Sequence, residues 1–430
     1  MSGRSYDDEQ TTQNVVPALA LANRRILIIV ENLPVPFDRR VWQEARTLRD
    51  AGAVVSVICP TGKGFEQTYE CLEGIHIYRH SLPLDADSAL GYLREYWAAL
   101  SCETGLAWKV LFTHGFDVIH ACNPPDLIFL VALPFKLLGK KFIFDHHDIN
   151  PELYEAKFKK RGFFWQVLVW LERLTFLCAD ASIATNDSYR RIAMTRGRMN
   201  PEKVSIVRSG PDLSRVKPVP PNPVWKNGRD FLVGYVGVMG AQEGIDLLLA
   251  SVDDIVHRLG RKDIQFCLVG GGPSLLSLKA QAVEMGLVDY VTFLGRASDK
   301  DLFEVLSTSD VCVNPDRVNP MNDLSTMNKI LEYMAMGKPI VQFDVTEGRF
   351  SAGPASLYAR ANDPLDFAQK IVDLLADEGA RRTMGEIGRQ RVESEFSWQH
   401  QIPKLIQAYQ ALFDGHEQKE ARLADSAVSK

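Results

Sequence analysis

Residues 311–341 read VCVNPDRVNPMNDLSTMNKILEYMAMGKPIV and predict a strand, a polar loop, a short helix and a second strand. The strand VCVNP ends at Pro315, and the loop after it carries the Asn, Asp and Pro residues typical of turns. Ser325 or Thr326 is expected to cap the helix, and Gly337 to end it. A helix that begins at the carboxyl end of a parallel strand presents free backbone N–H groups there, so this stretch predicts an α/β sheet with an anion-binding edge.

Two charged residues lie on the predicted helix. Lys329 and Glu332 are three positions apart and therefore share one helical face near its N-terminal end. A carboxylate at this place could accept hydrogen bonds from ribose hydroxyls. An ordinary surface ion pair is the alternative, and the stretch by itself does not decide between them.

The rest of the chain repeats this alternation of short apolar runs and longer helical patterns. Five runs lie in the first half, at 26–30, 54–59, 117–121, 141–145 and 181–185. Five more lie in the second half, at 231–237, 264–270, 290–295, 311–315 and 339–344. Apolar strands separated by helices indicate parallel sheets covered on both faces. The predicted fold class is therefore α/β, with two doubly wound parallel-sheet domains.

The domain boundaries follow from composition. Four prolines in VKPVPPNPVW predict a semi-rigid linker at 216–226, between a first domain at 23–215 and a second at 227–395. The remaining segments are a disordered tail at 1–22, a C-terminal helix at 396–416 that could cross back to the first domain, and a polar tail at 417–430. Two doubly wound domains offer a ligand site in the cleft between their strand ends.

Composition and charge exclude several classes of function. The formal net charge is −5, from 49 Lys and Arg against 54 Asp and Glu, so the chain lacks the basic excess of nucleic-acid-binding proteins. The seven cysteines include no C-x-x-C pair, which favours free thiols in a reducing compartment over disulfides or zinc. The first residues lack the features of a signal peptide, and no uncharged apolar run reaches the ~18 residues of a membrane-spanning helix. We therefore expect a cytoplasmic protein.

A glycine-rich turn opens the second half. The stretch GYVGVMGAQEG, residues 234–244, places Gly237, Gly240 and Gly244 between a strand and a helix, where backbone amides could approach a phosphate. It differs from the G-x-G-x-x-G fingerprint, so a dinucleotide ligand is not favoured. A turn needed only for its backbone geometry is the alternative.

Two arginines follow a plausible helix cap in the first half. Arg39 and Arg40 fall in the first turn after Asp38, where cations oppose the helix dipole. An anionic partner such as a phosphate would explain both arginines. Structural pairing with Asp38 or Glu44 is the alternative.

Polar residues also follow two further strands, in DVIHACNPPD (117–126) and FDHHDINPE (144–152). The side chains expected to face the cleft are His120, Asn123, Asp126, His146, His147 and Asp148. A hydrogen bond from His146 or His147 to a substrate hydroxyl is favoured over a capping or core role. No metal site is predicted, because adjacent histidines do not easily ligate one ion. The one H-x-x-x-H pair, His76 and His80, lies in the strand-like HIYRH, which separates the two rings by roughly 13 Å.

A basic cluster precedes an aromatic helical pattern at 157–178. The cluster consists of Lys157, Lys159, Lys160 and Arg161, and the aromatic residues directly after it are Phe163, Phe164 and Trp165. This arrangement is typical of a segment at an anionic membrane surface. A buried domain helix with solvated basic residues is the alternative.

Together these stretches resemble the retaining glycosyltransferases of family 4, which have the GT-B fold of two facing Rossmann-like domains. The resemblance runs from about Arg24 to Phe413. It rests on the order and spacing of IVENLPVPFDRRVWQEARTLRDAG, DVIHACNPPD, FDHHD, IVRSGPDLSR, GYVGVMGAQEGIDLLL, FLGR, NKILEYMAMGKPIV and FSW. It implies a nucleotide diphosphate sugar donor held mostly by the second domain. It also implies transfer with retention, by same-face substitution without a covalent intermediate.

The resemblance assigns roles to particular residues. Glu332 matches the second glutamate of the family's E-x7-E signature, which binds the donor ribose. Gly237 lies at the turn near the diphosphate, and Arg296 lies in the segment near the base. His147 falls at the D-x-H position near the donor sugar.

Several family charges are absent from this chain. The replacements are Leu324 for the first glutamate of the signature, Val238 or Met239 for an arginine, Glu243 for a lysine, and Cys122 for a histidine. Lys329 and Arg40 are our candidates for the missing positive charge at the diphosphate.

The predicted site therefore draws on both domains. The catalytic residues are His147, Lys329 and Asn123, and the donor-binding residues are Glu332, Gly237, Gly240, Arg296, Asn328, Ser325 and Arg40. No metal or cofactor is predicted beyond the nucleotide sugar as co-substrate. The expected partners are this donor, a lipid-linked or glycan acceptor and an anionic surface on the inner membrane face. We expect a role in bacterial surface-polysaccharide or glycoconjugate synthesis. A sugar-nucleotide epimerase and a non-catalytic nucleotide-sugar-binding scaffold are the alternatives.

Overall fold

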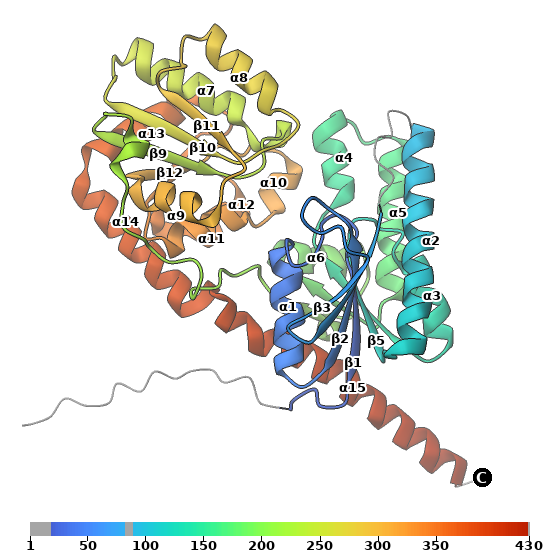
Figure 1. Ribbon diagram of the computed structural model, residues 1–430. Helices are drawn as coiled ribbons and strands as arrows, with labels where there is room; N and C mark the ends of the chain where they lie inside the picture. The colour runs from blue at the N-terminus through green and yellow to red at the C-terminus, as the bar shows by residue number, and fades with distance from the viewer. Residues whose placement is uncertain (1–18, 82–88, 429–430) are drawn as a thin grey trace, which may run out of the picture.

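The protein contains two α/β domains that lie side by side, followed by a long helix that passes from the second domain to the first (Figure 1). The structure is a computed structural model and describes residues 19–81 and 89–428, with the side chains of 89–96 and 415–428 left out. Most of the predicted tail at 1–22 lies outside the described residues. In the part of the chain that is described, no helix has both the length and the apolar composition needed to span a bilayer.

The first domain is built on an eight-stranded sheet. Its strands are β1 (Arg25–Ile29), β2 (Val54–Pro60), β3 (Tyr69–Leu72), β4 (Ile75–His80), β5 (Val118–Cys122), β6 (Lys141–His146), β7 (Ala181–Ala184) and β8 (Val204–Ile206). The order is β3-β4-β2-β1-β5-β6-β7-β8, and only the β3–β4 pair is antiparallel. The direction of winding reverses between β1 and β5, so a crevice for ligands opens at their carboxyl ends.

Six helices belong to this domain in the described residues. They are α1 (Arg39–Asp50), α2 (Ala89–Thr113), α3 (Phe129–Leu137), α4 (Asn150–Phe158), α5 (Phe163–Cys178) and α6 (Asp187–Thr195). Helix α1 begins where expected, because the carboxylate of Asp38 accepts a hydrogen bond from the backbone N–H of Val41 at 3.1 Å. This cap places Arg39 and Arg40 at the carboxyl end of β1.

The second domain has a six-stranded parallel sheet in the order β11-β10-β9-β12-β13-β14. Its strands are β9 (Phe231–Val236), β10 (Ile264–Val269), β11 (Val291–Gly295), β12 (Val311–Asn314), β13 (Ile340–Phe343) and β14 (Ser356–Ala359). Its helices are α7 (Ile245–Asp253), α8 (Leu275–Glu284), α9 (Asp299–Thr308), α10 (Pro320–Leu324), α11 (Asn328–Ala335), α12 (Thr346–Ala352), α13 (Pro364–Ala376) and α14 (Glu378–Arg391). Here the winding reverses between β9 and β12, so the glycine-rich turn after β9 and the polar loop after β12 meet at one edge.

The α/β prediction is confirmed, and each of the ten predicted strands is present with its ends within one residue. Of the other four strands, β4 was expected only as the strand-like HIYRH, and β3, β8 and β14 were not predicted. All three are edge strands of three or four residues, and each has partly exposed positions, so they lack the long apolar run that marks a buried strand.

The final helix, α15 (Trp398–Val428), packs against the first domain. Its residues Leu405 and Tyr409 are fully buried in a core that they share with Val41 and Leu48 of α1. The indole N–H of Trp398 donates to Thr47 Oγ1 at 3.0 Å. The helix continues through most of the segment that was predicted as a separate polar tail, so that boundary was wrong.

The predicted loop after β12 contains a further helix, α10 (Pro320–Leu324). Asn319 caps it by accepting hydrogen bonds from the backbone N–H groups of Met321 and Asn322, both at 3.0 Å, and Pro320 occupies the first helical position. Because α10 ends at Leu324, the next helix begins later than predicted. Its cap residue is Met327, which makes no side-chain bond, so the predicted cap at Ser325 or Thr326 was wrong.

The proline-rich segment between the domains is held against α9. The backbone N–H of Val219 donates to Ser307 Oγ at 2.9 Å, and that of Asn222 donates to Thr308 Oγ1 at 2.8 Å. Trp225 adds an indole hydrogen bond to Glu304 at 3.2 Å. The segment is therefore attached to the second domain.

Candidate active site

Two adjoining cavities of about 470 and 480 Å³ lie between the domains. The residues that line both are Phe37, Arg39, Arg40, Ser209, Asn328 and Glu332. The cavity of about 480 Å³ is also lined by His147 and Asp148 of the first domain and by Gln242 and Glu243 of the second. These side chains follow β1, β6, β9 and β12, so the fold brings the carboxyl ends of both sheets to one cleft.

An ion pair joins the two sides of this cleft. Arg39 contacts Glu332 Oε1 at 3.2 Å and Asp299 Oδ1 at 3.3 Å, both in the opposite domain. Arg215 also binds Asp299, at 2.8 Å. Burial raises the pKa of Glu332, and the charges of Arg39 and Arg215 oppose this shift. Glu332 therefore lies where the sequence predicted, with a guanidinium partner that the sequence did not identify.

The neighbouring Arg40 has a different position from the one predicted. Its guanidinium is buried and donates to Asp145 Oδ1 at 3.0 Å, to the carbonyl oxygen of Val207 at 2.9 Å and to Ser209 Oγ at 3.1 Å. Glu44 lies 3.1 Å away. Arg40 thus lines the cleft as a largely buried cation that is already paired with two carboxylates, which disfavours the predicted role as an unpaired positive charge at a diphosphate.

His147 and Asp148 are the residues of the FDHHD stretch that line the cleft. The side chain of His147 is 15% exposed, and its Nε2 lies 2.6 Å from Asp145 Oδ2. Burial by itself would raise the pKa of Asp145, but Arg40 and His147 hold it well below its usual range. The ionised carboxylate lies against Nε2, and Arg40 Nε donates to the same ring nitrogen at 2.9 Å, so both groups fix the orientation of the ring. By contrast, His146 is buried against Glu172 at 3.3 Å and points away from the site.

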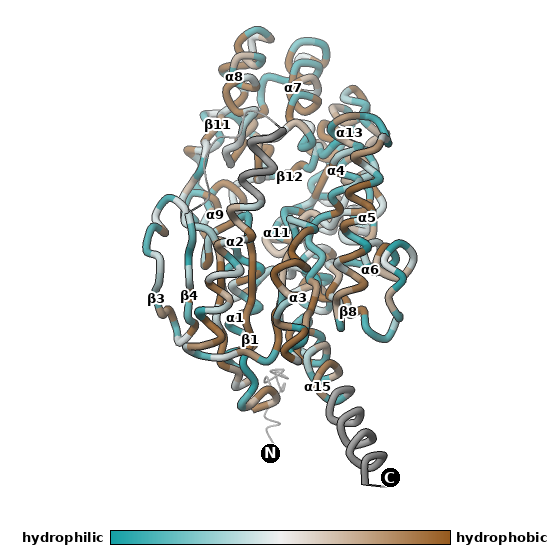
Figure 2. Tube along the Cα trace, turned by 90° about the vertical axis from the view of Figure 1, so that its right-hand side faces the viewer, coloured by the Kyte–Doolittle hydropathy of each residue, from teal (hydrophilic) through white to brown (hydrophobic). Residues whose placement is uncertain are grey.

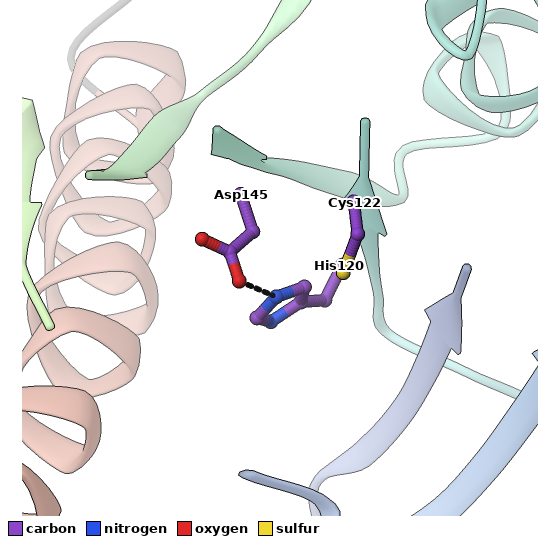
Figure 3. Close-up of side chains that lie close together, drawn as sticks. All are labelled: His120, Cys122 and Asp145. Atoms are coloured by element: carbon purple, nitrogen blue, oxygen red, sulfur yellow. Dashed lines mark hydrogen bonds and ion pairs between the residues drawn. The ribbon is translucent and has the colours of Figure 1, made fainter. Parts of the chain in front are cut away.

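A second histidine extends this network into the core (Figure 3). His120 Nε2 lies 3.2 Å from Asp145 Oδ2, and His120 Nδ1 lies 2.7 Å from the hydroxyl of Tyr409 in α15. Burial lowers the pKa of His120, so the ring is neutral. It then donates through Nε2 and accepts through Nδ1. A continuous chain of hydrogen bonds connects Tyr409 to His147 through His120 and Asp145, and sequence reasoning did not identify Tyr409.

Some of these groups lie close enough together to raise the question of a metal ion. Ligand atoms of His120, Cys122 and Asp145 are all within 4.8 Å of one another (Figure 3). Both oxygens of Asp145 already accept from Arg40. Burial also raises the pKa of the Cys122 thiol well above its usual value, so the thiolate that a metal requires is disfavoured. This donor set does not fit a divalent metal.

Asn123 lies below the cleft, and its hydrogen bonds fix the backbone that forms one wall of the cleft. Its amide Nδ2 donates to Asp126 Oδ1 at 2.8 Å and to the carbonyl oxygen of Asp148 at 2.6 Å. Its Oδ1 accepts from the backbone N–H groups of His147 and Asp148, at 2.7 and 3.1 Å. The fully buried side chain therefore uses all its hydrogen-bonding capacity on the protein. Asn123 is a positioning residue for His147, and the prediction of a catalytic role was wrong.

Lys329 is enclosed within the second domain. Its Nζ lies 2.7 Å from both Glu243 Oε2 and Asp316 Oδ1, and 5.1 Å from the ring centroid of Tyr235. Burial and the charge of Glu243 raise the pKa of Asp316 to about 7, although Lys329 opposes the shift. Lys329 thus supplies the positive charge that pairs with Glu243. Glu243 is the residue that replaces a lysine in the resemblance described above. The structure therefore contradicts the prediction that Lys329 is free to neutralise a diphosphate.

The glycine-rich turn packs tightly against a second glycine loop. The backbone N–H of Gly237 donates to Val269 at 3.0 Å, and that of Met239 donates to Gly271 at 2.9 Å. A Cβ on Gly270, whose φ is +140°, would lie 1.8 Å from the carbonyl oxygen of Gly237. Neither Gly237 nor Gly240 lines the two cavities, whereas Gln242 and Glu243 just beyond them do. The turn therefore places Gln242 and Glu243 in the cleft. The backbone N–H of Gly237 already donates to Val269, so it is not available to a phosphate.

Of the remaining predicted residues, Asn328 and Ser325 line the cleft, and Arg296 contacts Phe37, which lines both cavities. The Arg296 guanidinium is 5.2 Å from the ring centroid of Phe37 in the first domain. Asn328, the first residue of α11, is exposed and lines both cavities. Ser325 Oγ donates to the carbonyl oxygen of Met321 at 2.8 Å and lies 2.9 Å from the hydroxyl of Tyr189 in the other domain.

Comparison with known proteins assigns this fold and cleft to a family. The family model for glycosyltransferase family 4 matches residues 38–215, and that for glycosyl transferases group 1 matches residues 230–377. Between them they cover both domains. The chain belongs to the family 4, group 1 glycosyltransferases, and it is an enzyme of glycosyl transfer.

Individual relatives agree with this assignment. The α-maltose-1-phosphate synthase of Mycolicibacterium smegmatis is 27% identical over 64% of this chain and 73% of its own length. A GDP-mannose-dependent monoacylated α-(1-6)-phosphatidylinositol monomannoside mannosyltransferase of Corynebacterium glutamicum is 27% identical over 40% of this chain and 44% of its own length. The chain thus spans about three quarters of one relative and less than half of the other.

Solved structures share the fold. Sucrose-phosphate synthase from Thermosynechococcus elongatus superposes with a TM-score of 0.76 at 21% identity, over 91% of this chain and 100% of that one. HepE from Anabaena, solved in complex with UDP-glucose, superposes with a TM-score of 0.68 at 17% identity, over 91% of this chain and 99% of that one. The two parallel-sheet domains are those of the GT-B fold.

Proposed function

We propose that this enzyme moves a sugar from a nucleotide diphosphate sugar to a lipid-linked or polysaccharide acceptor, with retention of anomeric configuration, in bacterial glycoconjugate synthesis. One observation carries the proposal. Glu332 of the second domain and His147 of the first line the same cavity at the strand ends of both sheets. A donor that spans this cavity would have its ribose at Glu332 and its sugar at His147. HepE in complex with UDP-glucose is a precedent for such a donor on this fold.

The cleft supplies cations for the diphosphate, although not those predicted from the sequence. Arg39 is exposed and lines the cleft, Arg296 is exposed and contacts Phe37 from the opposite domain, and α11 begins at Asn328 in the cleft. Arg39 is now paired with Glu332 and Asp299. An incoming donor would offer ribose hydroxyls to Glu332 and phosphate oxygens to Arg39, so both partners keep a hydrogen-bonded counterpart.

The surroundings of His147 favour retention without a covalent intermediate. Asp145, the carboxylate in contact with His147, is fully buried and accepts from Arg40 at both oxygens and from His120. A carboxylate held in this way is a poor nucleophile, because its oxygens are already occupied. His147 then positions the donor sugar and acceptor, and the cations stabilise the departing diphosphate.

A membrane surface is part of the proposal. Phe163, Trp170 and Leu177 recur along one stripe of α5 and are 73%, 58% and 60% exposed. Figure 2 colours much of α5 and the adjacent α3 as hydrophobic. Exposed apolar stripes of this kind mark interaction surfaces, and basic residues at one end suit anionic lipid. The exposure of Phe164, 65%, further supports this surface over the alternative of a buried domain helix with solvated basic residues.

A panel of UDP-, GDP- and ADP-sugars tests the function. We expect one donor to raise the unfolding temperature and to support transfer to a lipid-linked acceptor, with the product anomer identical to that of the donor by NMR. An inverted product would refute retention. Conversion of the free sugar nucleotide without transfer would favour an epimerase, and donor binding without turnover would favour a scaffold.

A further inference from the structure

A separate apolar groove lies on the first domain beside α4. It has a volume of about 240 Å³ and is lined by the turn after β5, by α4 and by α5. Its apolar and aromatic walls are formed by Leu127, Leu153, Tyr154, Phe158, Leu168 and Leu171. We call it the α4 groove. An open surface of this composition is unfavourable in water unless a ligand covers it.

One end of the α4 groove meets the wall of the catalytic cleft. Asp126 and Asn150 line this end, and Asn150 follows two residues after Asp148, which lines the cleft. Asn123 joins the two sites directly, because its amide binds Asp126 at 2.8 Å and the backbone N–H of His147 at 2.7 Å. The fully buried Asn123 is thus part of the wall between the two sites, so a molecule with its polar head in the cleft reaches the groove by passing over the N-terminus of α4.

The other end of the α4 groove opens at the basic turn. Lys157 and Phe158 line it and close α4, and Lys159, Lys160 and Arg161 follow. Arg161 pairs with Glu155 at 2.8 Å. Within the described residues no carboxylate forms an ion pair with Lys157, Lys159 or Lys160. The nine residues of α4 give the groove a length of about 13 Å between cleft and basic turn.

We propose that the α4 groove binds the hydrocarbon chain of a lipid-linked acceptor. The inference rests on the proposed function, in that the acceptor's polar head occupies the cleft. The chain then runs along α4 and leaves between the unpaired lysines, where anionic lipid head groups would meet it. The exposed Phe163 and Trp170 of α5 continue the apolar surface beyond that exit.

A hydrocarbon chain fits the α4 groove better than a helix of a partner protein does. A partner helix would cover the groove from outside and has no reason to begin at the cleft. It would also need acidic residues opposite the three lysines. A hydrocarbon chain needs only apolar walls, and the groove joins a polar site to a basic surface as an amphiphile requires.

The test uses the full chain without donor, and the probe is farnesyl phosphate with a photoreactive diazirine on its terminal isoprene unit. Leu168→Trp fills the groove, and Leu276→Trp on the exposed face of α8 is the matched control. Loss of two methylene contacts already weakens binding roughly tenfold, so we expect at least this loss in Leu168→Trp and none in the control. Labelled peptides should come from α4 and α5. Unlabelled farnesyl phosphate should compete, and inorganic phosphate should not.

Leu153→Gln is a second variant, which makes the groove polar without filling it. It keeps the test decisive if the tryptophan variant does not fold. Labelling that is unsaturable, that competes away with inorganic phosphate, or that is equal in folded groove variants and control would overturn the proposal. The measurement involves no transfer. A positive result with an inactive donor panel would leave the hydrocarbon site standing and refute the proposed transfer from these donors, whereas transfer without groove labelling would refute only the groove.

Discussion

Glu332 and Lys329 share one face of α11, yet their charged ends have different surroundings. Glu332 reaches the cleft and meets Arg39 of the other domain, whereas Lys329 is buried between Glu243 and Asp316. The three-residue spacing predicted the shared face. It could not predict the partners, because Glu243 is 86 positions away in the sequence.

The substitution Glu332→Gln tests the donor site. A charge-assisted hydrogen bond to ribose is lost, so donor binding should weaken by roughly 1–3 kcal/mol in calorimetry. Because burial raises the pKa of Glu332, wild-type affinity should fall with decreasing pH at a higher pH than for an ordinary glutamate. Glu284→Gln on the exposed part of α8 is the control. Unchanged affinity in a folded Glu332→Gln variant would remove Glu332 from the site.

Lys329→Ala tests the buried cluster. Removal of the amine leaves Glu243 and Asp316 without a cation, so the free energy of unfolding in urea should fall by about 3–5 kcal/mol. Turnover should fall roughly tenfold, because Glu243 lines the cavity. The exposed Lys279→Ala variant should match wild type. Partial recovery in Lys329→Met with Asp316→Asn would confirm that the cost is an unpaired charge, and wild-type stability of Lys329→Ala would contradict the cluster.

At the scale of elements, helices bring distant residues to the site. Helix α15 packs against α1 and delivers Tyr409 to His120, and α4 leads from the cleft to the basic turn. Apolar spacing predicted that these segments are helical. Which strand ends they reach depends on packing against the whole sheet.

Tyr409→Phe tests the buried hydrogen-bond chain. His120 Nδ1 would lose its donor, which should cost about 1–3 kcal/mol of unfolding free energy. It should also shift the pH dependence of turnover, because His120 and His147 share Asp145. Trp398→Phe in the same helix removes the bond to Thr47 and should lower stability without this shift. Identical pH profiles for Tyr409→Phe and wild type would limit Tyr409 to a structural role.

The basic turn and α5 should bind anionic vesicles in a salt-sensitive manner. Each basic residue near an anionic leaflet contributes roughly 1 kcal/mol, so changing Lys157, Lys159, Lys160 and Arg161 to Gln should greatly reduce sedimentation with phosphatidylserine liposomes at low salt. Neutral phosphatidylcholine liposomes are the control. Equal binding of wild type and the quadruple variant would point to a soluble or partner-delivered acceptor.

At the scale of the whole molecule, a few side-chain contacts join the two domains around the cleft. Arg39 pairs with Glu332 and Asp299, while Ser188 donates to Glu347 at 2.6 Å and Tyr189 meets Ser325 at 2.9 Å. These contacts surround the cavity and leave it accessible. Arg39 and Glu332 therefore serve both the contact between the domains and the proposed donor site.

Arg39→Ala tests this coupling. The arginine is half exposed, so its loss should change the free energy of unfolding by less than about 1 kcal/mol. The donor KM should nevertheless rise, since the group that faces the diphosphate is gone. Arg49→Ala in the same helix, which pairs with Asp50 and Glu73 inside the first domain, is the control. Equal KM values for the two variants would exclude Arg39 from the donor site.

The sequence by itself determined the two-domain α/β fold, ten of the strands and the cleft positions of Glu332, His147, Asn328 and Arg296. These depend on apolar runs, turn residues and family motifs, which are carried by neighbouring residues. Only the tertiary structure decided that Arg39 is exposed in the cleft while Arg40 is buried against Asp145, that Asn123 is fully occupied by the protein and that Lys329 is neutralised. Such outcomes depend on partners far apart in the chain, as with His120 and Tyr409, which are separated by 289 positions and meet only because α15 returns to the first domain.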